Sequence, residues 1–419
     1  MNKVGVLLIV GCIFLLFVCM FHNVSGFQAD TWVSKASMNH ARAYLGTAVV
    51  NGKIFAIGGD EGSEMGNCMT GTSMTSNVVN YTEEYDPVSN VWVEKAAMPT
   101  SRAQFGTAVF QNKIYCIGGY NGANVPQNDS WRTEYYTLSN NEAYDPTTNT
   151  WTRLASMPTP RYSAATNIVN GVIYVMGGHT MTDLYTTYNL TEVYNPQTNT
   201  WTTKKPSPLP ISSPASAVID DKIFVLGDLS YPNYDFVLMV YDPASDSWTI
   251  GDKAPVRYAA TAVSTNDVNA AKRIYLFDEN RTDIYNPVTN NWSTGNSAPT
   301  DRLIAKAAIL DDTIYLIGGR TGQWGYMTFM YPSPLNEQYI PLSCEQSNEP
   351  ESESTSPSNT AIAPTNIESA SPSGNLQAEK QNATSPFWLT TPMIAIFCVC
   401  AVFFLCLGLV LYARKHKLR

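Results

Sequence analysis

A short pattern recurs six times along the 419-residue chain, and this repetition constrains the fold more than any other feature. The first part of the pattern is an apolar run that ends in paired glycines. Its six copies are Lys53–Gly59, Lys113–Gly119, Val172–Gly178, Lys222–Asp228, Arg273–Glu279 and Thr313–Gly319. In the fourth copy Asp228 replaces the second glycine, and in the fifth copy Asp278 and Glu279 replace both.

Three further elements accompany each run. Turns of the type Tyr-Asp-Pro or Tyr-Asn-Pro lie at Tyr85, Tyr144, Tyr194, Tyr241 and Tyr285, with a worn copy at Tyr339. Tryptophans follow these turns at Trp92, Trp151, Trp201, Trp248 and Trp292. Stretches of small residues begin at Arg42, Arg102, Arg161, Arg257 and Arg302, and Ile211 takes the place of the arginine in the fourth copy. Because these arginines recur with the repeat itself, we interpret them as structural.

Each element is a short, alternating, β-branched or aromatic run bounded by turn residues, which is typical of a β-strand. Every repeat therefore predicts a four-stranded antiparallel sheet. Such a sheet cannot bury both faces alone, so neighbouring units must stack against one another.

The order of these elements resembles the kelch repeat, which has a glycine pair, Tyr-Asp-Pro and Trp at a period of roughly 50 residues. The resemblance covers about Thr31 to Pro341. It implies an all-β fold, a six-bladed β-propeller with one blade per repeat. The sixth repeat has no tryptophan strand, whereas an unmatched one, Trp32–Met38, precedes the first repeat. We therefore expect the N-terminal strand to complete the last blade. The alternatives are a seventh, degenerate blade and an open ring.

The N-terminal flank predicts export. Residues 1–26 have a lone Lys3, an apolar run and small residues near Gly26, which is the layout of a signal peptide. A retained N-terminal anchor is the alternative. The propeller is expected to occupy residues 27–342.

The C-terminal flank predicts a membrane anchor. Residues 343–386 are rich in Ser, Pro and Thr and are expected to form a disordered stalk. Residues 387–413 contain the uncharged stretch Met393–Tyr412, long enough for one transmembrane helix, although a buried core helix is the alternative. The tail, residues 414–419, is basic and is expected to stay cytoplasmic. We predict a single-pass protein of the cell membrane whose propeller is extracellular.

The cysteines carry little information. Five of the eight fall in the two flanking apolar segments. Cys116 lies in an apolar run and is expected to be a buried small hydrophobe. A Cys68–Cys344 disulfide suits an exported protein, but the two residues are expected near opposite faces, beyond the reach of a disulfide. Whether these two cysteines are free stays open.

Binding is expected on the propeller face that carries the loops after the second strand of each blade. The long ones are residues 60–80, 120–141, 179–191, 228–236 and 320–336. Aromatic side chains suit contact with a protein or a glycan. The candidate binding residues are Trp131, Tyr135, Tyr136, His179, Tyr185, Tyr188, Tyr231, Tyr234, Trp324 and Tyr326. The alternative for each ring is that it only packs the loops together.

Charge and sequons add two expectations. The net charge of −9 and the lack of a basic stripe outside the tail argue against a nucleic-acid partner. Asn-X-Ser/Thr sequons are candidate glycosylation sites in an exported protein. They lie at Asn80, Asn128, Asn189, Asn280, Asn291 and Asn382.

No catalytic constellation is visible, and we predict no metal and no cofactor. Only His40 and His179 lie in the expected propeller, so the copper site of galactose oxidase, which belongs to kelch-like propellers, is not readily supplied. The kelch-like sialic-acid epimerase suggests an alternative, an extracellular sugar-processing enzyme acting at the mouth of the central channel. Its candidate groups are His179 and Lys306. Lys306 stands where the other repeats carry the small residues Gly46, Gly106, Ala165, Ala215 and Thr261. Converging titratable groups in a pocket would favour the enzyme.

Overall fold

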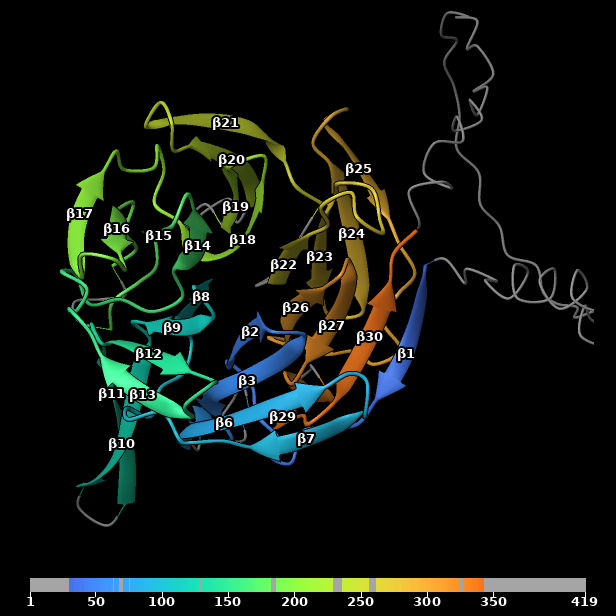
Figure 1. Ribbon diagram of the computed structural model, residues 1–419. Coiled ribbons are helices and arrows are strands. Elements are labelled where there is room, and N and C mark those ends of the chain that lie inside the picture. The colour runs from blue at the N-terminus through green and yellow to red at the C-terminus, as the bar shows by residue number, and fades with distance from the viewer. Residues whose placement is uncertain are drawn as a thin grey trace, which may run out of the picture. The chain divides into compact units, whose positions relative to one another are not determined.

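The computed structural model describes residues 30–62, 64–67, 71–74, 76–127, 130–181, 186–228, 236–255, 261–323 and 327–342. Six four-stranded antiparallel sheets stand as blades around a central axis (Figure 1). None of the described residues forms a helix with the length and apolar character that a membrane crossing needs. The predicted signal peptide, stalk, transmembrane segment and basic tail lie outside the described residues.

The blades follow one another along the chain, each from its inner to its outer strand. The first three blades are β2 (Gly46–Val50), β3 (Lys53–Asp60), β6 (Val78–Asp86) and β7 (Val91–Glu94); β8 (Gly106–Phe110), β9 (Lys113–Ile117), β12 (Asn141–Asp145) and β13 (Thr150–Arg153); and β14 (Ala165–Val169), β15 (Val172–Met176), β16 (Thr191–Asn195) and β17 (Thr200–Lys204). The next two are β18 (Ser212–Ile219), β19 (Lys222–Asp228), β20 (Phe236–Asp242) and β21 (Ser247–Lys253); and β22 (Thr261–Ser264), β23 (Ile274–Asp278), β24 (Arg281–Asn286) and β25 (Asn291–Thr294).

The sixth blade combines both ends of the propeller sequence. Its strands are β26 (Lys306–Leu310), β27 (Thr313–Ile317), β30 (Asn336–Ile340) and, outermost, β1 (Thr31–Lys35). Trp32 lies opposite Tyr339 in the antiparallel register of β1 and β30. The prediction of six blades closed by the N-terminal strand is confirmed.

The Tyr-Asp-Pro turns are held by a tyrosine hydroxyl and an asparagine. Tyr85 donates to Asn90 Oδ1 at 2.7 Å, and Asn90 adopts a φ of 56°, a left-handed conformation that asparagine tolerates. Two residues later, Trp92 Nε1 donates to the carbonyl oxygen of Ala36 in the connection that precedes the blade, at 2.7 Å. The pattern links neighbouring blades, and it repeats at Tyr144 with Asn149, Tyr194 with Asn199, Tyr241 with Asp246 and Tyr285 with Asn290.

In the last blade Asp30 takes the place of this asparagine. Tyr339 donates to the Asp30 carboxylate, which also accepts the backbone N–H of Asn296 at 3.0 Å. Asp30 has a φ of 59°, and Trp32 Nε1 donates to the carbonyl oxygen of Asn296 at 2.9 Å. The N-terminal segment therefore supplies the turn acceptor as well as the missing strand.

Buried ion pairs tie the segment before the inner strand to the third strand in four of the blades. Arg102 pairs with Glu142 at 2.5 Å, Arg161 with Glu192 at 2.5 Å and Arg302 with Glu337 at 2.6 Å. Arg42 pairs with Glu83 in the same way. All four arginines and all four glutamates are buried, so the structural interpretation is confirmed for these four arginines. The fifth, Arg257, lies outside the described residues.

The fourth blade replaces both members of this pair together. Ile211 stands at the arginine position, and Met239, two residues before Tyr241, stands at the glutamate position. Both side chains are fully buried and belong to one apolar cluster. The same space in the blade is thus filled either by an ion pair or by two apolar side chains.

The paired glycines allow the next blade to approach closely. The N–H of Gly59 in the first blade donates to the carbonyl oxygen of Arg102 in the second, at 3.0 Å. A Cβ atom on Gly58 would lie 2.6 Å from that same oxygen, closer than real Cβ contacts. The repeated Gly-Gly and Arg elements are therefore the two sides of one contact between blades.

Candidate binding face and central cavity

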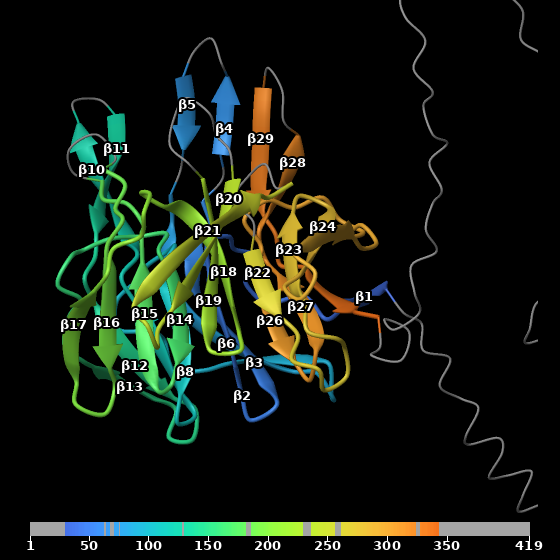
Figure 2. The ribbon, with the colours of Figure 1, turned by 90° about the horizontal axis from the view of Figure 1, so that it is seen from above.

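The long loops share one face of the propeller with the starts of the inner strands. Isolated backbone bridges join Ala43 to Asp60, Ala103 to Tyr120 and Tyr162 to His179, each linking the segment before an inner strand to the end of the second strand. We call this side the long-loop face. Figure 2 shows the strands built from its loops standing above the blades.

Two of the predicted long loops form one sheet together. Strands β4 (Glu64–Asn67) and β5 (Gly71–Met74) come from the first blade, and β28 (Arg320–Gln323) and β29 (Met327–Pro332) come from the sixth. They pair in the order β28-β29-β4-β5, which we call the crest sheet (Figure 2). The two predicted long loops therefore contain strands of their own, and backbone pairing across two blades satisfies the N–H and C=O groups of both segments.

A third long loop forms a hairpin. Strand β10 (Tyr120–Gln127) pairs with β11 (Ser130–Thr137) on the second blade, in a register from Tyr120 opposite Thr137 to Gln127 opposite Ser130. This segment was predicted to be a loop, and it contains Pro126 and several glycine and asparagine residues, which are typical of turns. The hairpin is an isolated two-stranded sheet, where an edge proline is tolerated.

A buried ion pair lies at the base of the crest sheet. Arg320 Nη2 in the sixth blade is 3.7 Å from Asp60 Oδ2 in the first, and the two side chains are 3 % and 4 % exposed. Asp60 also accepts the N–H groups of Gly62 at 2.7 Å and Asn77 at 2.8 Å. The guanidinium of Arg320 lies over the ring of Tyr44, 5.2 Å from its centroid. Asp60 thus holds both ends of the first-blade loop that contains β4 and β5, and it also contacts the start of the sixth-blade loop through Arg320.

Aromatic rings form a floor beneath the long loops of the second and third blades. Tyr120 meets Tyr135 edge-to-face at 5.5 Å and Tyr162 at 5.6 Å, and Tyr162 packs on His179 at 5.1 Å. Burial, together with the nearby Asp60 carboxylate, raises the pKa of Tyr120 well above its usual value. This floor supports the hairpin from below.

The predicted binding residues fall into three groups. Tyr136 is 49 % exposed on the hairpin, and its hydroxyl donates to Glu134 at 3.0 Å. Tyr135 and His179 pack against other rings as just described, and Tyr188 is half-buried. The side chains of Trp131, Tyr185, Tyr231, Tyr234, Trp324 and Tyr326 lie outside the described residues. Sequence reasoning missed Tyr331, which lies within the predicted loop 320–336 and is 52 % exposed on β29.

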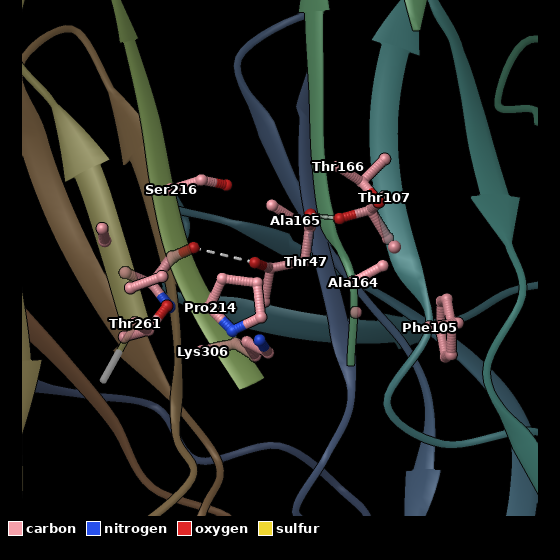
Figure 3. Close-up of a pocket in the computed structure, with 15 residues that line it drawn as sticks. Thr47, Phe105, Thr107, Ala164, Ala165, Thr166, Pro214, Ser216, Thr261 and Lys306 are labelled. Carbon is pink, nitrogen blue, oxygen red and sulfur yellow. Dashed lines mark hydrogen bonds between the residues drawn. The ribbon is translucent and has the colours of Figure 1, made fainter. Parts of the chain in front are cut away.

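The central channel holds a cavity of about 190 Å³ between the inner strands. Figure 3 shows threonines from several blades around it, together with Lys306. Thr47 donates to the carbonyl oxygen of Ala307 at 2.8 Å, and Thr107 donates to that of Thr47 at 2.8 Å. These hydroxyls satisfy carbonyl groups of inner strands, each of which is the free edge of its sheet.

A second cavity of about 220 Å³ lies at the mouth, on the long-loop face. Its rim residues have left-handed backbones: Tyr44 (φ 56°), Gln104 (51°), Ser163 (51°), Ser213 (40°) and Ile304 (61°). The N–H of Gln104 donates to the carbonyl oxygen of Tyr44, and that of Ser163 to Gln104, both at 2.9 Å. The strained backbone, most unusual for a β-branched residue such as Ile304, lets successive blades bond around the mouth.

The structure does not bring the candidate catalytic groups together. Lys306 lines both cavities, whereas His179 lines neither and contacts the hydroxyl of Ser213 at 3.2 Å. Burial lowers the pKa of His179. His40 lies apart, 3.0 Å from Glu94 and stacked on Tyr81. Within the described part of the chain, no cluster of His, Cys, Asp or Glu is arranged to hold a metal ion.

The sequons differ in what their amide groups contact. Asn80 Nδ2 donates to the carbonyl oxygen of Met98 at 3.0 Å, and Asn189 Nδ2 to that of Ser207 at 3.3 Å. Asn280 and Asn291 are exposed. Asn128 and Asn382 lie outside the described residues, as do Cys68 and Cys344. Cys116 is a buried free thiol, as predicted.

The chain matches the kelch motif over residues 41–99, 101–158 and 160–208, which are its first three repeats. It is 30 % identical to Kelch-like protein 36 of Rattus norvegicus over 150 residues, 36 % of this chain and 21 % of that protein. It is 29 % identical to an F-box/kelch-repeat protein of Arabidopsis thaliana over 155 residues, 35 % of this chain and 36 % of that protein. It is also 36 % identical over 96 residues to Kelch-like ECH-associated protein 1A of Danio rerio, 23 % of this chain and 15 % of that protein.

A solved structure shares the fold. The structure of YjhT superposes with a TM-score of 0.52 at 14 % sequence identity, covering 71 % of this chain and 95 % of that one. This similarity supports the propeller fold of the present chain over the part that superposes.

Proposed function

Because the chain is a kelch-repeat protein, we propose that its propeller binds a protein or glycan partner on the long-loop face. Kelch-repeat proteins typically mediate protein–protein interactions. The observation that carries the choice of face is the crest sheet, in which loops from two blades pair above the ring. A protruding sheet and a hairpin on a rigid scaffold provide a shaped surface at low entropic cost.

Two exposed tyrosines support a binding role for these strands. Tyr136 lies on β11 and Tyr331 on β29, and each is about half exposed. Tyrosine offers a large contact area with few rotatable bonds, which is why it is enriched at interface centres. Among the residues whose side chains the structure describes, neither ring packs against another ring as the buried tyrosines at the blade turns do.

We place this binding outside the cell. The proposal rests on the signal-like residues 1–26 and on the uncharged Met393–Tyr412 followed by basic residues. In this arrangement the stalk, residues 343–386, joins the propeller to its anchor. The sequons then become available to the glycosylation machinery.

The experiment uses the full-length chain on intact cells. A membrane-impermeant biotin reagent tests exposure of the propeller, and proximity labelling from the propeller identifies neighbouring surface molecules. The double variant Tyr136→Ser/Tyr331→Ser is expected to lose the labelled partner. Loss of about 2 kcal/mol per interface tyrosine corresponds to roughly 30-fold weaker binding for each.

The matched control changes two apolar side chains on the opposite face. Val88 and Val288 are 94 % and 84 % exposed in the turns between third and fourth strands. The double variant Val88→Ser/Val288→Ser should keep the partner. Equal loss in both double variants contradicts the choice of face, and absence of surface biotinylation contradicts the location. Periodate treatment of the partner cells distinguishes a glycan, which it destroys, from a protein.

A further inference from the structure

A lysine in the wall of the central cavity lacks an ion-pair partner among the described residues. Lys306, on β26, is half-buried and lines both the cavity between the inner strands and the cavity at the mouth. None of the described side chains that line either cavity carries a negative charge. Among the described lining residues its ammonium group is the one charged group, in a chain whose net charge is −9.

The remaining wall offers neutral hydrogen-bonding groups. Each inner strand is an edge of its sheet, so N–H groups along the channel side have no strand partner. The hydroxyl of Thr166, which lines the cavity, is shielded from solvent and has no hydrogen-bond partner among the described residues. At the mouth, Ser163 and Ser213 line the same cavity as the lysine, and their hydroxyls contact Gln104 Oε1 at 2.8 Å and His179 Nε2 at 3.2 Å.

An ammonium group in this position needs either a counter-charge or neutralisation. Burial lowers the pKa of Lys306, because the charged form is poorly solvated. An anion in the cavity would supply the missing counter-charge. A volume of about 190 Å³ is many times what a single water requires, so the cavity has room for a small solute.

From this geometry we infer that the central cavity binds a small carboxylate anion, with Lys306 as its charged contact. A doubly charged phosphate is usually held by several cationic or clustered N–H donors, whereas one ammonium with hydroxyls suits a single charge. The carboxylate has two sources: a free organic acid, or an acidic side chain of a partner that enters through the mouth. The inference goes beyond the proposed function, because a free acid would bind even if the long-loop face held no protein.

The test is thermal unfolding of the full-length chain in detergent micelles, titrated with acetate at constant ionic strength set by chloride. A ligand that binds only the folded state raises the unfolding midpoint with its concentration, by several degrees at about one hundred times Kd. We expect this rise in the wild-type chain, and its loss in Lys306→Met. Lys306→Arg should retain part of the rise, because it keeps the charge.

The matched control removes a lysine elsewhere. Lys113 is 49 % exposed, pairs with Asp145 at 3.5 Å and begins β9 at the face opposite the long loops. Lys113→Met should respond to acetate like the wild-type chain. Because methionine removes a poorly solvated charge, Lys306→Met should fold, and its midpoint without acetate checks this. An unchanged acetate response in Lys306→Met, or no response in the wild-type chain, would overturn the inference.

A second arm replaces acetate with a triglutamate peptide to distinguish the two sources. A response to both ligands that requires Lys306 indicates that an acidic side chain can reach the site from the mouth. A response to acetate alone indicates a free organic acid. A response to the peptide that survives Lys306→Met, with none to acetate, overturns the proposal.

Discussion

The pair Arg161 and Glu192 gives the sharpest test of how the blades are stabilised. Arg161 donates to Glu192 at 2.5 Å, to the carbonyl oxygen of Thr159 at 3.1 Å and to that of Val175 at 3.0 Å. Burial lowers the pKa of the guanidinium, although Glu192 opposes this shift. Replacing Arg161 by Ile leaves a carboxylate that is 4 % exposed without its cation.

The fourth blade supplies the compensating change. Ile211 and Met239 occupy the two equivalent positions there, so Arg161→Ile/Glu192→Met reproduces a combination that the propeller already accommodates. Breaking a buried pair by removing one partner costs about 3–5 kcal/mol, whereas replacing both with apolar groups is often neutral or stabilising. The double variant still leaves the Thr159 hydroxyl without its acceptor, Glu192 Oε1, and the carbonyl oxygens of Thr159 and Val175 without the Arg161 donor, at a combined cost of about 2 kcal/mol.

The assay is urea unfolding of the full-length chain, followed by tryptophan fluorescence, for the wild-type chain, both single variants and the double variant. We expect each single variant to lose about 3–5 kcal/mol of unfolding free energy, and the double variant to lie within about 1–2 kcal/mol of the wild-type chain. Single losses that simply add in the double variant would refute the reasoning, because they would show that the two positions are not coupled.

Three further predictions follow from other contacts. Asp30→Ala removes the acceptor of the Tyr339 hydroxyl and of the Asn296 N–H, so it should lower the unfolding free energy by about 2 kcal/mol and speed hydrogen exchange in β1. Asp30→Asn keeps an acceptor oxygen and should be nearly neutral, so equal effects of the two substitutions would count against the turn role. Asp60→Asn breaks the buried ion pair with Arg320, so amide hydrogen exchange should become faster in peptides that cover β4, β5 and β29 and stay unchanged in β14–β16. Faster exchange throughout the propeller would contradict a local role for this pair. Glycopeptide mass spectrometry of the protein from a glycosylating host should find glycans at the exposed Asn280 and Asn291. It should find none at Asn80 or Asn189, because the side-chain amides of these two residues donate to backbone carbonyl groups. Glycans at Asn80 would contradict this prediction.

The blades were predictable because each repeat carries its own strand and turn signals. The apolar run, the Tyr-containing turn and the tryptophan recur in one order, so the fifth copy can be assigned to a blade although Asp278 and Glu279 replace its glycine pair. Ring closure was predictable for a similar reason, since Trp32 had no blade of its own. Asp30 was missed, although an Asn or Asp two residues before each tryptophan was visible in every repeat.

Contacts between repeats were much harder to predict. The glutamate partners of the buried arginines lie about 30 to 40 positions away, and only the fold brings them together. The crest sheet joins β4 to β29, which are separated by most of the propeller sequence. Strands β4, β5 and β28 each contain a glycine and have weak strand propensity, so their pairing across two blades could not be predicted from local pattern. The rim of left-handed residues at the channel mouth likewise follows from bonding between blades.

A site-specific cross-link tests the choice of binding face most directly. A photo-reactive amino acid is placed at Tyr136 or Tyr331 on the long-loop face, or at Val88 or Val288 on the opposite face, in the full-length chain on cells. We predict that the partner cross-links from the two tyrosine positions and not from the two valine positions. Cross-links from the valine positions alone, or equally from all four, would contradict binding through the long-loop face.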